Sequence, residues 1–245
     1  YDLVLTDVRM PCMDGLELLG RIRELRPDTK VMVMTAESTP DSVIASIRQQ
    51  AFIYFSKPFS PSAVAEMMEQ ALQSSSPSWQ DDIEVFSAIP QWISLRVRCR
   101  PEVATRVLHF LREMKMDLPA QEREDIATAF HELLLNAIEY GGRSDPKQKI
   151  RVTYIRTARA VFYHIGDPGQ GFSFDDLPHA AVSNPASAPM EHVDVRRSRG
   201  IRPGGFGIML ARNLADEVMY NEKGNEVLLI KYINRGNSHD EKENP

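Results

Sequence analysis

The feature that most constrains the fold is an alternation of short apolar runs with amphipathic stretches over residues 1–72. The apolar runs LVLTD, KVMVMTA and FIYFS are each followed by a stretch whose apolar residues recur at helical spacing, as in GLELLGRIREL. Strands that alternate with helices predict a parallel sheet with helices on both faces. We therefore expect a doubly wound α/β domain in this part of the chain.

Beyond this region the order of the elements changes. The predicted elements are, in order, a strand at 93–99, helices at 101–116 and 119–140, a strand pair in KIRVTYIR and AVFYHIGD, and a hairpin in VMYNEKGNEVLLIKYI. Gly141 and Gly142 follow the last apolar turn of the second helix and are expected to end it. The pattern predicts an α+β sandwich, in which helices gather on one face of an antiparallel or mixed sheet.

The segment QSSSPSWQDD separates these two parts and has no periodic apolar face, so we expect an exposed connector there. The predicted organisation is a first domain at 1–72, a linker at 73–92, a second domain at 93–235 and a polar tail at 236–245. Inside the second domain, residues 173–203 form a long irregular stretch with several prolines. A loop of that length within a compact domain usually has a function.

Composition excludes several classes of protein. The formal net charge is −5, from 29 basic and 34 acidic residues, which disfavours nucleic acid as a partner. No apolar run approaches the roughly 18 residues needed to span a bilayer, so no membrane span is expected. Cys12 and Cys99 are too few for a disulfide framework and suit a reducing compartment. We therefore expect a cytoplasmic protein.

The long predicted helix carries Glu132 and Asn136, whose four-residue spacing places them on one helical face. An amide oxygen is a suitable ligand for Mg²⁺, which keeps several waters and is commonly shared with substrate phosphates. A carboxylate one turn earlier can accept a proton from an attacking hydroxyl. For an isolated pair of this kind, a solvated glutamate and a helix-face asparagine are the commoner interpretation.

Two glycine-containing motifs follow. Asp167 ends a predicted strand, and Gly169 and Gly171 follow it, so a carboxylate can accept from an exocyclic amine while the backbone passes close to a flat ligand. Gly205 and Gly207 precede the helical pattern IMLARNLADEV, and the free N–H groups at a helix start suit a di- or triphosphate. Each motif alone is weak evidence, because either could be an ordinary turn.

The order and spacing of these motifs resemble the N, G1 and G2 boxes of the Bergerat-type ATPases, which include histidine kinases, gyrase and MutL. The segments HELLLNAIEYGG, IGDPGQGF and RPGGFGIMLARNLADEV are most similar to the anti-sigma-factor serine kinases, over about residues 93–235. The resemblance implies ATP and Mg²⁺ as ligands. It assigns Mg²⁺ coordination to Asn136, the adenine amino group to Asp167, the adenine pocket to Gly169 and Gly171, the phosphates to Gly205 and Gly207, and the role of catalytic base to Glu132.

The same resemblance implies that residues 173–203 are the ATP lid, with Arg199 or Arg202 near the phosphates. A solvated loop is an equally good interpretation of those arginines. His131 directly precedes Glu132, and one residue along a helix turns a side chain by about 100°. We therefore expect His131 to be a packing or surface residue and not a phosphoacceptor.

In the first domain, polar residues end the predicted strands, and LTDVRMPCMDG, VMVMTA and YFSKPF closely resemble response-regulator receiver domains. The resemblance implies that Asp7 is the phosphoacceptor, Thr35 the switch hydroxyl, Tyr54 the switch aromatic and Lys57 the phosphate-pairing cation. Receivers begin with a strand that bears an acidic pair for Mg²⁺, and no such strand precedes Tyr1. We expect the sequence to be a fragment; the alternative is a receiver that has lost its metal site.

Together the resemblances imply a bacterial signalling protein that phosphorylates a serine or threonine of a partner under receiver control. The expected partners are a STAS-type anti-anti-sigma domain or a sigma factor, and an upstream histidine kinase for the receiver. The alternative is a nucleotide-gated binding module that sequesters a sigma factor or adaptor with little phosphotransfer. A histidine kinase ranks last, because residues 73–100 contain no histidine and no long helical pattern. The related kinases are commonly dimers, which leaves a homodimer open.

Overall fold

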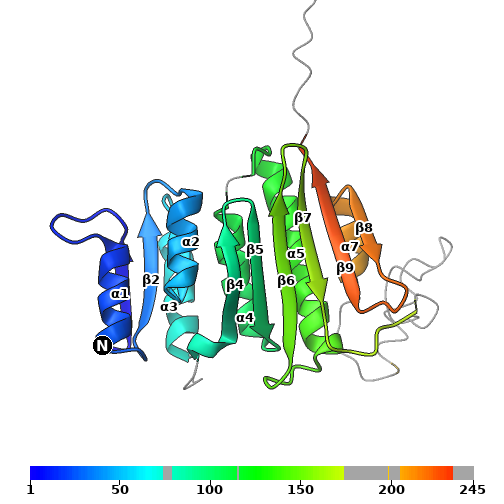
Figure 1. The fold of residues 1–245 in the computed structure, drawn as a ribbon, viewed down its shortest axis with the longest axis horizontal. Helices are drawn as coiled ribbons and strands as arrows, with labels where there is room; N and C mark the ends of the chain where they lie inside the picture. Colours follow the sequence, from blue (N-terminus) through cyan, green and yellow to red (C-terminus); the bar gives the residue numbers. More distant parts are fainter. Residues whose placement is uncertain (74–78, 115, 174–197, 199–204, 234–245) are drawn as a thin grey trace, which may run out of the picture.

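Two sheets lie side by side in the computed structural model, which describes residues 1–73, 79–114, 116–173, 198 and 205–233 (Figure 1). The elements of the first part are β1 (Leu3–Asp7), α1 (Gly15–Leu25), β2 (Lys30–Thr35), α2 (Pro40–Arg48), β3 (Ile53–Ser56) and α3 (Pro61–Gln73). The elements of the second part are η1 (Trp79–Asp82), β4 (Ile83–Ile89), β5 (Trp92–Arg98), α4 (Pro101–Arg112), α5 (Ala120–Asn136), η2 (Ala137–Gly141), β6 (Lys149–Arg156), β7 (Ala160–Gly166), α7 (Gly207–Leu214), β8 (Glu217–Tyr220) and β9 (Glu226–Tyr232).

The first sheet is parallel and has the order β1-β2-β3. Successive residues of its central strand point to opposite faces. Val31 and Val33 belong to an apolar cluster that includes residues of α1 and α2, whereas Met32 packs in a second cluster with Met67 of α3. Helices therefore cover both faces, which confirms the doubly wound architecture expected from the alternating pattern.

Local polar groups fix where the first helices begin. The carboxylate of Asp14 accepts the backbone N–H of the third residue of α1 at 2.7 Å. Gly15 follows, and a Cβ at that position would lie 2.1 Å from the carbonyl oxygen of Asp7, so only glycine lets α1 start against the end of β1. Helix α2 begins at a reciprocal capping box formed by Thr39 and Ser42.

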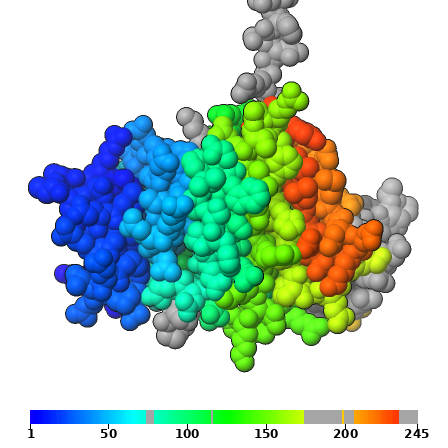
Figure 2. All heavy atoms as spheres, in the orientation of Figure 1, coloured from blue at the N-terminus to red at the C-terminus, as the bar shows by residue number. Residues whose placement is uncertain are grey.

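The second sheet has the order β4-β5-β6-β7-β9-β8, and all its neighbouring strands are antiparallel. Helices α4, α5 and α7 lie behind it in the view of Figure 1, and the opposite face forms the front surface in Figure 2. The rings of Phe130 on α5 and Tyr163 on β7 lie 4.7 Å apart at the centre of this layer. The expected α+β sandwich is confirmed.

Within the described ranges, no helix has the length and apolarity that crossing a bilayer requires.

The structure differs from the sequence-based expectation in the segment that joins the two parts. Residues 83–89 form β4, which pairs with β5 and carries a bulge between Val85 and Ser87. Trp79 and Asp82 are each only 2% exposed, although an exposed connector was expected around them. Their burial depends on single long-range contacts, which leave no periodic pattern in the sequence. Residues 74–78 lie outside the described part of the chain.

One buried cation links the two parts and this connector. The guanidinium of Arg106, on α4, donates to the carbonyl oxygen of Phe52 at 3.1 Å, to that of Trp79 at 3.3 Å and to the carboxylate of Asp82 at 3.1 Å. Burial lowers the pKa of Arg106 to about 10, so the side chain remains charged at neutral pH. Burial also raises the pKa of Asp82, and the attraction of Arg106 opposes that rise. The partners of Arg106 thus come from the residue that precedes β3 and from the two ends of η1.

The packing of α4 against α5 predicts a pH dependence of stability. Burial, with the nearby charge of Arg112 and the neighbouring His131, lowers the pKa of His109 to about 4. An unfolded histidine titrates near pH 6.5, so between these values the unfolded chain binds a proton that the folded chain excludes. The contribution of His109 is therefore intact above about pH 6.5 and is lost as the pH falls towards 4, by up to about 3 kcal/mol.

Urea denaturation at several pH values between 7 and 4.5 would measure this effect. We expect the free energy of unfolding to fall less steeply on acidification in His109→Phe than in the wild-type chain. An equal slope in both proteins would contradict the assignment to His109.

Candidate functional site

Helix α5 brings together the two polar residues that the four-residue spacing predicted to share a face. A Cβ placed on Gly207, the first residue of α7, would lie 3.0 Å from Oε2 of Glu132 and 3.0 Å from Nδ2 of Asn136. Both side chains therefore reach the start of α7, and the absence of a side chain on Gly207 leaves room for them. The first and third predicted motifs thus meet in space.

The end of α5 meets the second motif. The helix continues into a π-helical turn, η2, a feature that is frequent at functional sites. A Cβ on Gly141 would lie 2.2 Å from Cγ of Asp167, and a Cβ on Gly169 would lie 3.0 Å from Cα of Gly141. The backbone of the helix end therefore packs directly on the Asp167 carboxylate. The sequence identified Gly141 only as a helix end, and this second role was missed.

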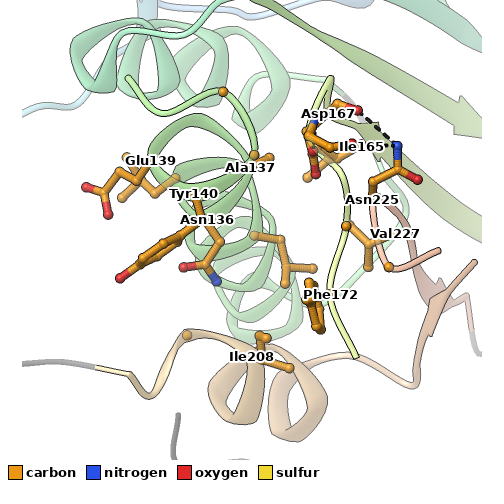
Figure 3. Close-up of a pocket in the computed structure, with 18 of the residues that line it drawn as sticks. Asn136, Ala137, Glu139, Tyr140, Ile165, Asp167, Phe172, Ile208, Asn225 and Val227 are labelled. Atoms are coloured by element: carbon orange, nitrogen blue, oxygen red, sulfur yellow. Dashed lines mark hydrogen bonds between the residues drawn. The ribbon is translucent and has the colours of Figure 1, made fainter. Parts of the chain in front are cut away.

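Asp167 is held by its neighbours on the strand side of the site. Its Oδ1 accepts the N–H of Gly169 at 2.8 Å, its backbone N–H donates to the carbonyl of Asn225 at 2.9 Å, and the Asn225 side chain donates back to its carbonyl at 3.2 Å (Figure 3). Burial raises the pKa of Asp167, and the Gly169 N–H opposes that rise. Among the described residues, Oδ2 has no hydrogen-bond partner, so it is available to accept from a ligand. Asn225 was not singled out from the sequence.

The turn between β8 and β9 closes against the segment that follows Asp167. Gly171 has φ +80°, and a Cβ there would lie 1.8 Å from the carbonyl oxygen of Lys223. Gly224 has φ +74°, and a Cβ there would lie 2.1 Å from the carbonyl oxygen of Phe172. Glycine is required at both places because the two backbones touch and both dihedral angles lie in the left-handed region. The sequence predicted that the Gly171 backbone lies close to a flat ligand; the structure shows it against the backbone of Lys223, and Gly171 also lines the cavity described next.

These elements line one cavity of about 1040 Å³. Figure 3 shows Asn136 and Tyr140 on the helical side and Asp167 and Asn225 on the strand side. Ligand pockets of roughly 300–1,000 Å³ accommodate molecules of nucleotide size. Gly205 and Phe206 also line the cavity, just before α7. All seven residues predicted for the nucleotide site therefore lie at this cavity: Glu132, Asn136, Asp167, Gly169, Gly171, Gly205 and Gly207.

The chemistry of the lining fits a nucleotide with Mg²⁺. In the described part of the chain, no group of three or more His, Cys, Asp or Glu residues could cage a metal ion. A site with one amide ligand, Asn136, is consistent with a cation that is shared with phosphates and water. The glycine-lined gaps beside Asn136 and Asp167 are spaces that a Cβ would fill. Arg199, Arg202 and nearly all of the predicted lid lie outside the described residues.

His131 behaves as the sequence predicted. Its Nε2 is buried and has no hydrogen-bond partner among the described residues. Burial, with the charge of Arg112, lowers its pKa and favours the neutral ring. It does not line the cavity that Glu132 lines.

The carboxyl end of the parallel sheet carries a second site. The ammonium of Lys57 pairs with the carboxylate of Asp7, and that hydrogen bond lowers the pKa of Asp7. Thr35 is buried, and its hydroxyl donates to a carbonyl in the following turn at 3.0 Å. Tyr54 is fully buried, with its hydroxyl 2.7 Å from that of Ser42. Asp7 and Lys57 thus form one cluster, whereas the hydroxyls of Thr35 and Tyr54 are engaged by their own neighbours.

Comparison with known families matches both parts of the chain. The family described as histidine kinase-like ATPase domain matches residues 97–231, and the family described as response regulator receiver domain matches residues 1–69. The segment of β4 and η1 lies between the two matched ranges.

Individual relatives match over short stretches. The DNA-binding transcriptional regulator NtrC of Azospirillum brasilense is 40% identical over 76 residues, which are 31% of this chain and 16% of that protein. NtrC of Escherichia coli K12 is 41% identical over 71 residues, 29% of this chain and 15% of that protein. The chain therefore spans about a sixth of the length of these relatives. Among solved structures, the receiver domain of NtrX from Brucella abortus is 27% identical, with 31% of this chain and 64% of that chain covered and a TM-score of 0.29.

The contact between Gly141 and Asp167 generates a prediction. In Gly141→Ala the new methyl group must displace the Asp167 carboxylate, so we expect the affinity for ATP to fall by about tenfold or more, the loss of roughly one charge-assisted hydrogen bond. Isothermal titration with ATP and Mg²⁺ measures the loss. Gly20→Ala on α1, where the nearest atom would be the end of a glutamine side chain at 3.3 Å, is the matched control and should bind as the wild type does. Unchanged affinity in Gly141→Ala would show that Asp167 is not held by this contact.

Proposed function

We propose, from the premise that the chain belongs to the histidine kinase-like ATPase domain family, that it is an ATP-dependent serine/threonine protein kinase of the anti-sigma-factor type. The observation that carries the proposal is the convergence of Glu132 and Asn136 on Gly207, across one cavity from Asp167. A carboxylate beside the predicted metal ligand is what transfer to a protein hydroxyl needs, because the hydroxyl must lose its proton as it attacks.

Binding would be divided between the two sides of the cavity. On the strand side, the free oxygen of Asp167 would accept a hydrogen bond from the adenine amino group. On the helical side, the amide oxygen of Asn136 would hold Mg²⁺. The backbone N–H groups at the start of α7, near Gly205 and Gly207, would donate to phosphate oxygens, where the helix dipole favours negative charge.

Transfer would require one protein base. Bound ATP with Mg²⁺ supplies the γ-phosphoryl group. Glu132 would accept the proton of the serine or threonine hydroxyl while that oxygen forms a bond to the γ-phosphorus. The bond from the γ-phosphorus to the bridging oxygen breaks, and ADP leaves with the electron pair.

The receiver and the partner complete the proposal. We place the receiver at 1–72 and the ATPase domain at 93–235 with β4 (83–89) added to its sheet, and we propose that a phosphodonor histidine kinase acts on Asp7, with Thr35, Tyr54 and Lys57 as the switch residues. The hydroxyl donor would belong to a STAS-type domain, or the chain would act on a sigma factor. Between α3 and α4, the described residues 79–98 form η1, β4 and β5 and not a helical hairpin with a histidine, which favours this class over a histidine kinase.

Nucleotide binding tests the first half of the proposal. Titration with labelled ATP and Mg²⁺ should give saturable binding that falls by about tenfold or more in Asn136→Ala and in Asp167→Asn, because each removes a charge-assisted contact. Asn213→Ala on α7, which is exposed, and Asp125→Asn on α5, which is half-buried, lie outside the cavity lining; they are the matched controls and should bind normally. If both site variants keep full affinity, the cavity is not the nucleotide site.

Phosphoryl transfer tests the second half. We expect Glu132→Gln to keep its affinity for ATP and to lose about 100-fold or more in transfer to a purified STAS-domain partner, because an amide cannot take the proton. Glu124→Gln, an exposed residue of the same helix that pairs with Arg112, is the control. Undiminished transfer by Glu132→Gln would remove the proposed base. Saturable binding without transfer by the wild type would favour the nucleotide-gated binding module.

A further inference from the structure

Glu113 directly follows α4 and reaches across to the first domain. Its Oε1 accepts two hydrogen bonds from Ser56, one from the backbone N–H at 3.0 Å and one from the hydroxyl at 3.0 Å. Ser56 is the last residue of β3 and directly precedes Lys57. The carboxylate of Glu113, in the second domain, is therefore hydrogen-bonded to the end of β3, directly before Lys57, the residue that pairs with Asp7.

A second segment of the first domain reaches the same residue. The hydroxyl of Ser38 donates a long hydrogen bond, 3.5 Å, to the carbonyl oxygen of Glu113. Ser38 lies one residue beyond the turn in which Thr35 exchanges hydrogen bonds with the backbone of Glu37. Glu113 thus contacts the two segments that carry the switch hydroxyl and the phosphate-pairing lysine.

The helix that Glu113 follows, α4, also contacts α5, the helix that carries Glu132 and Asn136. The neighbouring Arg112 pairs with Glu124 of α5 at 2.7 Å, and His109 of α4 lies near His131 of α5, the residue beside Glu132. The next described residues along the chain are buried: Met114 is 1% exposed, and Met116, whose sulfur accepts from Tyr163, is 2% exposed. A displacement at the end of α4 is therefore passed to α5, because a close-packed interior transmits small shifts.

From these contacts we infer that Glu113 is a positioning residue that couples the Asp7–Lys57 pair to the ATP site, through Ser56 on one side and through α4 and α5 on the other. The inference rests on the proposed function and names the regulation of that site. A change of charge at Asp7 alters its ion pair with Lys57 and thereby shifts the end of β3. The two hydrogen bonds between Ser56 and Glu113 pass this shift to α4 and on to α5, the helix that carries Glu132 and Asn136.

A double-mutant cycle on the full chain tests this coupling without any need for phosphorylation. Asp7→Asn removes the charge that pairs with Lys57, and we expect it to change the dissociation constant for ATP by about fivefold or more. In the Glu113→Ala background the same substitution should change it by less than about twofold, because the connecting acceptor is gone. Glu113→Gln keeps an oxygen that can accept both hydrogen bonds and should restore most of the Asp7→Asn effect.

Glu102→Ala is the matched control, since Glu102 is an exposed residue in the first turn of the same helix. The Asp7→Asn effect should persist at full size in that background. An Asp7→Asn effect of equal size with and without Glu113, or no effect in the otherwise wild-type chain, would overturn the inference while leaving ATP binding intact.

Amide hydrogen exchange separates this inference from the proposed function. Without nucleotide, Asp7→Asn should alter exchange in α4 and α5, and the change should disappear in Glu113→Ala. If the wild type fails to bind ATP but shows this exchange pattern, the nucleotide proposal fails and the coupling stands. If ATP binds but exchange in α4 and α5 does not respond to Asp7→Asn, the coupling fails alone.

Discussion

The arrangement of the two sheets depends on the buried guanidinium of Arg106. Removing a cation from water costs several kcal/mol, and the cost is offset only where acceptors and geometry are nearly complete. Arg106 meets that condition with two carbonyl oxygens and one carboxylate, and its charge also lies 4.4 Å from the ring centroid of Phe52 and 5.3 Å from that of Trp79. These partners are Phe52, which directly precedes β3, and Trp79 and Asp82 of η1. The hydrogen bonds of the cation are therefore complete only when both domains and the connector are folded together.

Trp79 extends this interaction across the connector. Its ring meets that of Phe52 edge to face, at an interplanar angle of 73°. The guanidinium of Arg23 from α1 lies 4.4 Å from its ring centroid, and its indole N–H donates to the carbonyl of Asp28 at 3.3 Å. The connector is thereby fixed to the first domain, while Asp82 at its other end is fixed to Arg106. The described part of the connector, residues 79–82, is consequently packed against both domains.

Periodicity predicted the fold well because each sheet buries at least one regular face. The shared face of Glu132 and Asn136 followed from helix geometry, and the strand end and glycine spacing singled out Asp167 and Gly171, both of which line the cavity. Asn225 was not singled out from the sequence, and Gly141 was identified only as a helix end. The side chain of Asn225 donates to two backbone carbonyl groups, and Gly141 matters because it has no side chain beside Asp167. Neither contact has a period, and both join segments that are distant in the sequence.

The burial of the connector and β4 was missed for a related reason. One buried indole in a serine-rich segment produces no periodic apolar pattern. The bulge between Val85 and Ser87 interrupts the alternation of apolar and polar residues that predicts a strand. Sequence reasoning therefore does not predict single tertiary contacts between elements that are far apart in the chain. In this protein those contacts determine where the nucleotide site lies relative to the receiver.

Helix α4 is held by the first domain at two points that differ in strength. Arg106 lies in the middle of the helix, is 5% exposed and is fully engaged, so its release would leave buried polar groups unpaired. Glu113 lies just beyond the end of the helix, partly exposed, and hydrogen bonds to a charged group contribute only about 1.5–3 kcal/mol each. A helix with one strong central contact and one weaker terminal contact can tilt about the first when the second changes. Separating the two domains, by contrast, would require the loss of Arg106's partners as well.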